Sequence, residues 1–318
     1  MRRTGRSERR TLRPLLRLSA AAVAALAALA PLPGRACSVC NCGDPLLTST
    51  DPAAINGRLR LQLDTEYLRV DAGNEDDRSA MDHLTQWSYR LNAVYRPTES
   101  LSLVATVPFV SKDMHTTGAV EPMHGSEATG LGDVEVAARY ALWRGVNLGI
   151  GRVQELAVSA GTSTPTGPNG LKSEGVRIDE HGQPGTGSWG PFAGIHYRFE
   201  QGRWLGFAAL TGRVRTENGY QYTYGSSLLW SVHGQYTATK RVVLDLGVDG
   251  RYAAADEFAG ETVRNTGGTV LSAAPGVYLN AAGNAWLFVR GQVPFYKSFR
   301  GVQDQLPSVV TGIQYQVL

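Results

Sequence analysis

Several residue types that support catalysis or membrane-spanning helices are scarce in this sequence. Cysteine occurs three times in 318 residues and methionine four times. Beyond residue 36, no segment stays apolar for 18 residues, so we expect no transmembrane helix there. No combination of nucleophile, base and orienting group is evident, and Ser231 lies only two residues from His233 on one strand-like segment. We therefore do not expect an enzyme.

The first 36 residues have the features of an export signal. Seven arginines precede the apolar run 18–30, and the small residues Gly34 and Ala36 suit cleavage before Cys37. The run is shorter than the roughly 20 residues that a transmembrane helix needs. We predict a cleaved signal peptide at 1–36, a cysteine-containing periplasmic segment at 37–57 and an outer-membrane domain at 58–318.

Removal of the signal reverses the net charge of the chain. The whole sequence has 31 basic and 28 acidic residues, whereas residues 1–36 contain eight arginines and one glutamate. The mature chain then has 23 basic and 27 acidic residues, a net charge of −4. A weakly acidic chain gives no reason to expect nucleic acid as a partner.

What the sequence has in abundance is alternation of apolar and polar residues. In segment 242–252, Leu244, Leu246 and Val248 alternate with Asp245 and Asp249. Because strand side chains point to opposite faces with period two, such a strand has one apolar and one polar face. The same pattern predicts strands at 58–67, 86–95, 101–111, 132–143, 154–164, 189–199, 204–215, 224–236, 242–252, 269–279, 285–296 and 306–317.

The connections between these segments are alternately short and long. Tight links such as 96–100 and 200–203 alternate with long polar stretches such as 112–131 and 165–188. Short periplasmic turns and long external loops are typical of outer-membrane barrels, and here they place both termini on the periplasmic side. A soluble β-sandwich shares the alternation. The strand length, the loops and the aromatic residues at the strand ends favour the barrel.

The predicted fold is therefore all-β: a transmembrane antiparallel up-and-down β-barrel of about 12 strands, integral to the bacterial outer membrane and surrounded by its lipid. The apolar faces would contact lipid and the charged faces would line the lumen. The residues predicted to line it are Arg60, Asp64, Glu66, Arg90, Asp133, Glu135, Arg139, Arg198, Asp245, Asp249, Arg251 and Arg290. Such charges either tune the selectivity of a pore or fill a narrow barrel with ion pairs.

Two short motifs carry a family resemblance. Residues 130–134 read Gly-Leu-Gly-Asp-Val, and residues 164–167 read Thr-Pro-Thr-Gly. Together they resemble the outer-membrane family named after meta-pathway phenol degradation, whose members are described as porins or transporters. The strand rhythm extends the resemblance over most of the mature chain, although the motifs cover only its middle. The resemblance implies transport of hydrophobic aromatic molecules.

Two clusters of soft ligands suggest a metal site. All three cysteines, Cys37, Cys40 and Cys42, have spacing that suits copper or zinc, although a disulfide or a lipidated cysteine also fits an exported protein. In the predicted external loops Met81 lies two residues before His83, and two further methionines directly precede histidines. These two pairs are Met114 with His115 and Met123 with His124. Thioether and imidazole groups together suit copper.

Three functions remain as hypotheses. The first is a channel or transporter for passive uptake or efflux of small molecules, hydrophobic ones if the resemblance holds. The second is a metal-handling barrel that uses the cysteine cluster and the Met/His loops. The third is a structural barrel with a filled lumen.

Overall fold

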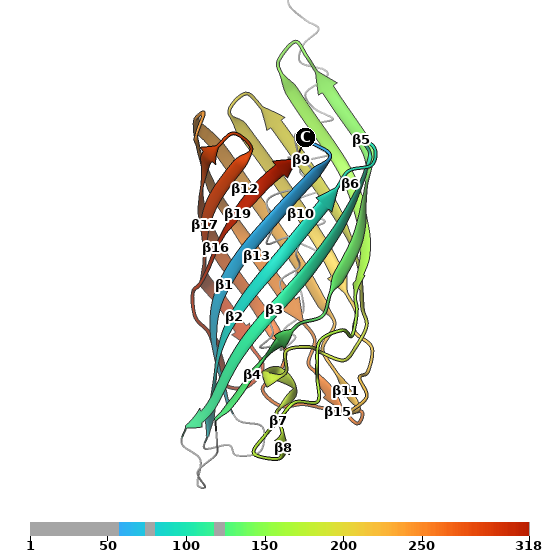
Figure 1. The fold of residues 1–318 in the computed structure, drawn as a ribbon, viewed down its shortest axis with the longest axis vertical. Helices are drawn as coiled ribbons and strands as arrows, with labels where there is room; N and C mark the ends of the chain where they lie inside the picture. The colour runs from blue at the N-terminus through green and yellow to red at the C-terminus, as the bar shows by residue number, and fades with distance from the viewer. Residues whose placement is uncertain (1–56, 74–79, 118–124, 318) are drawn as a thin grey trace, which may run out of the picture. The chain divides into compact units, whose positions relative to one another are not determined.

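The computed structural model describes residues 57–73, 80–117 and 125–317, and these form a closed antiparallel barrel (Figure 1). No helix in the described part of the chain is long and apolar enough to cross a membrane. The twelve barrel strands are β1 (Leu59–Gly73), β2 (Met81–Tyr95), β3 (Leu101–Thr117), β5 (Glu135–Asn147), β6 (Arg152–Ser163), β9 (Gly190–Gln201), β10 (Trp204–Arg213), β12 (Ser227–Thr239), β13 (Val242–Ala253), β16 (Gly268–Ala282), β17 (Ala285–Phe299) and β19 (Ser308–Val317).

Each barrel strand pairs with the next along the chain, and the last strand pairs with the first. β1 pairs with β2, with Leu59 opposite Tyr95, and also with β19, with Leu59 opposite Val317. Closure satisfies the backbone N–H and C=O groups of both terminal strands, as a strand protein in lipid requires. The prediction of an up-and-down barrel of about twelve strands is confirmed.

The outer wall is apolar and the inner wall is polar, as the period-two pattern predicts. On β13, Leu244 and Leu246 are 46% and 66% exposed, whereas Asp245 between them is buried. The other barrel strands repeat this arrangement, with exposed aromatic residues such as Tyr95 and Trp204 near the strand ends. An exposed apolar band of this kind is stable only in lipid, so the protein is integral to the outer membrane.

The long loops contain short elements of their own at the end of the barrel that the sequence predicts to be external. β4 (Ser126–Leu131) pairs with β3, and β18 (Gln303–Gln305) pairs with β1. Loop 164–189 contains the hairpin β7 (Lys172–Ser173) and β8 (Val176–Arg177), followed by the 3-10 helix η2 (Glu180–Gly182). β11 (Tyr222–Thr223), β14 (Glu257–Phe258) and β15 (Glu261–Thr262) form a small sheet from two further loops. In Figure 1 these elements lie at the opposite end from the C-terminus.

The strand bounds differ from the predicted ones at several strands. β5 continues to Asn147 instead of ending at 143, and β12 spans 227–239 instead of 224–236. Three strands are longer than predicted: β1 extends to Gly73, β2 begins at Met81 and β3 ends at Thr117. The polar residues beyond the apolar stretches form the same backbone pairing between strands. The predicted strand 132–143 begins only at Glu135. Its first residues form a break between β4 and β5, where the Asp133 carboxylate accepts hydrogen bonds from loop backbone instead of continuing the wall.

Candidate permeation path

The inner wall is built from charged and amide side chains on alternate strand positions. On β1, Arg60, Gln62, Asp64 and Glu66 are each 1% exposed. They are buried because strand alternation directs them into the barrel while the residues between them face lipid. A charged group in this position needs a partner or water, so its hydrogen bonds define how the lumen is filled.

An ion-pair network joins β1 and β2 at mid-strand. Arg90 donates from Nε to Asp64 Oδ1 at 2.6 Å and from Nη1 to Glu66 Oε2 at 2.8 Å. Asn92 donates to the second Asp64 oxygen at 2.7 Å, and Thr106 on β3 donates to Asn92 at 2.7 Å. The network therefore spans three neighbouring strands and positions one guanidinium over two carboxylates.

Two further ion pairs link strands on the lumen side of the wall. Arg139 on β5 pairs with Glu155 on β6 at 2.8 Å, between adjacent strands. Arg213 on β10 bonds to Glu135 on β5, although β6 and β9 lie between these strands in the barrel. The second pair is therefore a chord that passes β6 and β9 on the lumen side.

A histidine lies between two carboxylates on the opposite wall. His233 Nδ1 is 3.2 Å from Asp245 Oδ2, and its Nε2 is 3.0 Å from Asp249 Oδ1. Its ring stacks on Phe207, with centroids 4.8 Å apart. Gly247 faces the ring, and an added Cβ there would lie 2.3 Å from Nδ1. The absence of a side chain at 247 is what lets the histidine lie flat against the wall.

Three loops pack together at the end of the barrel that the sequence predicts to be external, and we call them the cap: residues 164–189, 214–226 and 254–267. Lys112 on β3 donates from Nζ to the carbonyl oxygens of His181 and Gln183, at 2.7 and 2.8 Å. Asp133 accepts from the backbone N–H of Thr186 at 2.9 Å and of Gly167 at 3.1 Å. These two charged residues anchor the first cap loop to the barrel wall.

The cap loops are joined to one another through Asp256. Its carboxylate accepts from Tyr222 Oη at 2.8 Å and from Gly225 N at 2.6 Å, and it lies 3.3 Å from His181 Nε2. Tyr224 Oη donates to the carbonyl of Glu180 at 3.0 Å. Asp256 is fully buried, and these contacts join the three loops into one packed unit.

A small cavity with charged residues in its lining lies beneath the first cap loop. Its volume is about 70 Å³, enough for a few water molecules. Burial raises the pKa of the Asp133 carboxyl that lines it, and the hydrogen bonds from Thr186 and Gly167 oppose this rise. The charged residues lining the cavity are Arg90, Lys112, Asp133, Glu135 and Arg215. The cavity connects the cap anchors with the ion pairs further down the lumen.

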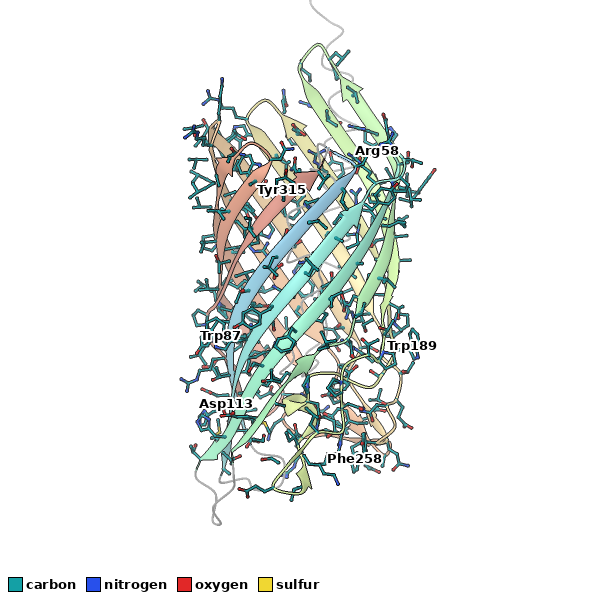
Figure 2. All side chains as sticks on the ribbon, in the orientation of Figure 1. Arg58, Trp87, Asp113, Trp189, Phe258 and Tyr315 are labelled. Atoms are coloured by element: carbon teal, nitrogen blue, oxygen red, sulfur yellow. The ribbon has the colours of Figure 1, made fainter. Side chains whose placement is uncertain are left out.

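Most of the residues predicted to line the lumen are buried inside the barrel. Nine of the twelve are buried: Arg60, Asp64, Glu66, Arg90, Glu135, Arg139, Arg198, Asp245 and Arg290. Asp249 and Arg251 are partly exposed on β13, and Asp133 lies in the break between β4 and β5. Figure 2 shows the side chains on the ribbon, with Arg58 and Tyr315 at the end of the short turns and Phe258 at the capped end.

The candidate metal ligands are not gathered at one point in the described structure. Met114 packs inward against Leu68, Val70 and Leu84, whereas the neighbouring His115 is exposed on the outer face of β3. Cys37, Cys40, Cys42, Met123 and His124 lie outside the described residues. Within the described ranges, no group of three or more histidine, cysteine, aspartate or glutamate residues could hold a metal ion. Copper or zinc binding stays a prediction.

Sequence reasoning missed two pairings between strands. Ser159 Oγ on β6 is 2.8 Å from His196 Nε2 on β9, inside the lumen. His83 on β2 stacks on His115 of β3, with centroids 5.1 Å apart, and its Nδ1 is 2.8 Å from Asp71 Oδ1. Both depend on strand register, for which spacing within a single strand gives no signal.

The fold and the apolar outer wall define an integral outer-membrane β-barrel, and comparison with solved structures agrees. The COG4313 outer membrane channel from Pseudomonas putida F1 is similar at 13% identity, over 84% of this chain and 98% of that chain, with a TM-score of 0.62. The transport unit of the autotransporter AIDA-I from Escherichia coli is similar at 10% identity, over 85% and 94%, with a TM-score of 0.51. At these identities the likeness concerns the fold.

Comparison of this sequence with known protein families and curated proteins does not assign it to a family. No protein-family model and no curated protein matches this chain. The resemblance drawn from residues 130–134 and 164–167 therefore stays a prediction. In the structure both motifs lie beside the anchor of the first cap loop, where Gly167 N donates to Asp133.

Proposed function

We propose that this protein is a passive outer-membrane channel for small solutes, which pass the cap and move along the charged inner wall. The observation that carries the proposal is the inner wall itself. Charged and amide side chains line it from Arg60 near the periplasmic end to Lys112 at the cap. A cavity with five charged residues in its lining lies beneath the cap and leaves space for water between the cap and the lumen.

The lining favours small polar solutes. A hydrophobic molecule on the axis would have to displace water from Arg90, Asp64 and Glu66 without offering hydrogen bonds in return, which is unfavourable. The Arg213–Glu135 chord also takes up space on the lumen side of the wall. The hydrophobic solutes implied by the family resemblance are therefore less well supported by this lumen than small polar ones are.

Liposome swelling with a graded series of solutes tests this function. We expect vesicles containing the folded protein to swell in glycine or a three-carbon polyol and to swell much more slowly in disaccharides, because the chord and the cap leave less space for larger solutes. Vesicles carrying heat-unfolded protein provide the baseline. If no solute of any size enters faster than this baseline, the channel proposal fails and the filled structural barrel replaces it.

A further inference from the structure

The periplasmic end of the barrel has an unusual distribution of charge. Three neighbouring hairpin ends carry exposed or half-buried basic residues, which we call the basic arc: Arg144 and Arg152 at the β5–β6 end, Arg203 at the β9–β10 end, and Lys240 and Arg241 at the β12–β13 end. The described turn between β16 and β17, Gly283 and Asn284, carries no charge. Arg58 before β1 and Arg96 in the β2–β3 turn lie at the same end of the barrel, so basic residues continue around this end on both sides of the uncharged β16–β17 turn.

Little within the protein neutralises the basic arc. Glu99, 3.9 Å from Arg144, is 93% exposed at its side chain, so this pair is weak. Glu200 lies nearby but pairs with Arg198 at 2.6 Å. Arg152 donates to the neutral Gln201 at 3.1 Å. In the described part of the chain, Arg203, Lys240 and Arg241 form no ion pair. The basic arc therefore keeps most of its five positive charges for an external partner.

Aromatic residues fix the depth of the basic arc in the membrane. Trp143 directly precedes Arg144, and Trp204 directly follows Arg203, with side chains 51% and 58% exposed. Trp204 packs against Tyr236 of the adjacent strand β12, with ring centroids 4.7 Å apart, and Tyr236 lies four residues before Lys240. The Arg152 guanidinium lies 5.5 Å from the Phe199 ring centroid. Exposed tryptophan and tyrosine mark the headgroup level of a bilayer, so the basic side chains lie at the level of the lipid phosphates.

We propose that the basic arc binds the phosphate headgroups of anionic phospholipids in the periplasmic leaflet. Arginine pairs with phosphate through charge-assisted hydrogen bonds, and each basic residue at this depth adds attraction to an anionic surface. Aromatic rings beside the arginines contact the glycerol and upper acyl region of the same lipids. An acidic protein partner is less well supported, because the basic groups lie at the aromatic belt and not beyond it.

Lipid retention after reconstitution tests this proposal. The protein is inserted into vesicles of equal parts phosphatidylglycerol and phosphatidylcholine, extracted in mild detergent, and its retained lipids are measured by mass spectrometry. We expect phosphatidylglycerol to exceed phosphatidylcholine about threefold among the retained lipids. In the variant R144Q/R152Q/R203Q/K240Q/R241Q this excess should fall by at least half.

The matched control removes five basic residues from the other end of the barrel: R69Q/K172Q/R264Q/K297Q/R300Q. This control should retain the wild-type lipid ratio, because its changes lie at the external end. Should the arc variant fail to give a folded, heat-modifiable band, K240Q/R241Q alone should lower the ratio part of the way. Equal retention in the wild type, an unchanged ratio in the arc variant, or an equal loss in the control would each overturn the proposal.

Discussion

Replacing Arg90 with methionine is expected to destabilise the barrel by about 3 kcal/mol, because it leaves two buried carboxylates without their shared cation. Asp64 and Glu66 are each 1% exposed, and Arg90 reaches them at 2.6 and 2.8 Å. The remaining negative charge should also shift ion selectivity toward cations. Urea-induced unfolding in vesicles measures the free energy of unfolding, and bilayer recordings under a salt gradient measure the selectivity.

The control for Arg90 removes the whole charge network. R90M/D64N/E66Q leaves no unpaired charge, so it should recover most of the stability that R90M alone loses. A loss below about 1 kcal/mol for R90M would mean that water in the lumen solvates both carboxylates as well as the guanidinium does. The lumen would then be wider at this level than the structure indicates.

The second large effect is expected at the cap. The variant K112M/D133A removes both charged anchors of the first cap loop, including the bonds from Lys112 Nζ to His181 and Gln183. Hydrogen bonds to charged groups contribute about 1.5–3 kcal/mol each, so losing roughly 3 kcal/mol would raise the ratio of open to closed cap about 100-fold. Single-channel recording should show longer openings and larger current steps.

A lysine within the same loop provides the comparison for the cap anchors. Lys172 is exposed on β7, so K172M changes the loop charge without releasing an anchor. K172M should show the same open times and current steps as the wild type. If K112M/D133A also shows wild-type open times and current steps, the cap does not control access to the lumen, and solutes enter by another route.

The sequence predicts the wall of this protein better than its interior. Segment 242–252 was enough to assign one apolar and one polar face, and β13 has these faces with Asp245 inside. Strand alternation is a local property, so it is readable from neighbouring residues. The same reasoning placed Arg90 and Asp64 on the inner wall without placing them together.

Pairing inside the lumen depends on register and on distance across the barrel, which no local pattern encodes. The Arg213–Glu135 chord joins residues 78 positions apart, and Ser159–His196 joins residues 37 apart. The cap was equally impossible to predict from the sequence. Its strands are two residues long, too short for a periodic signal, and Asp133 leaves the predicted strand 132–143 to anchor it.

The predicted signal peptide and the cysteine cluster rest on sequence pattern alone. The signal peptide at 1–36, the segment 37–57 and the Cys37–Cys42 cluster lie outside the described residues, so they stay predictions from residue pattern alone. The Met/His pairs show the limit of such patterns. Adjacent residues on a strand point to opposite faces, so Met114 and His115 of β3 cannot both bind the same metal ion.

Chemical modification of a single lumen residue tests the central claim most directly. In a variant with all three native cysteines replaced by serine, S88C places a thiol on the inner wall, where Ser88 lines the cavity, and Y89C places one on the lipid-facing wall. If solutes pass through the lumen, a small charged thiol reagent should reduce single-channel conductance in S88C and leave Y89C unchanged. Unchanged conductance in a modified S88C protein would contradict permeation along this path.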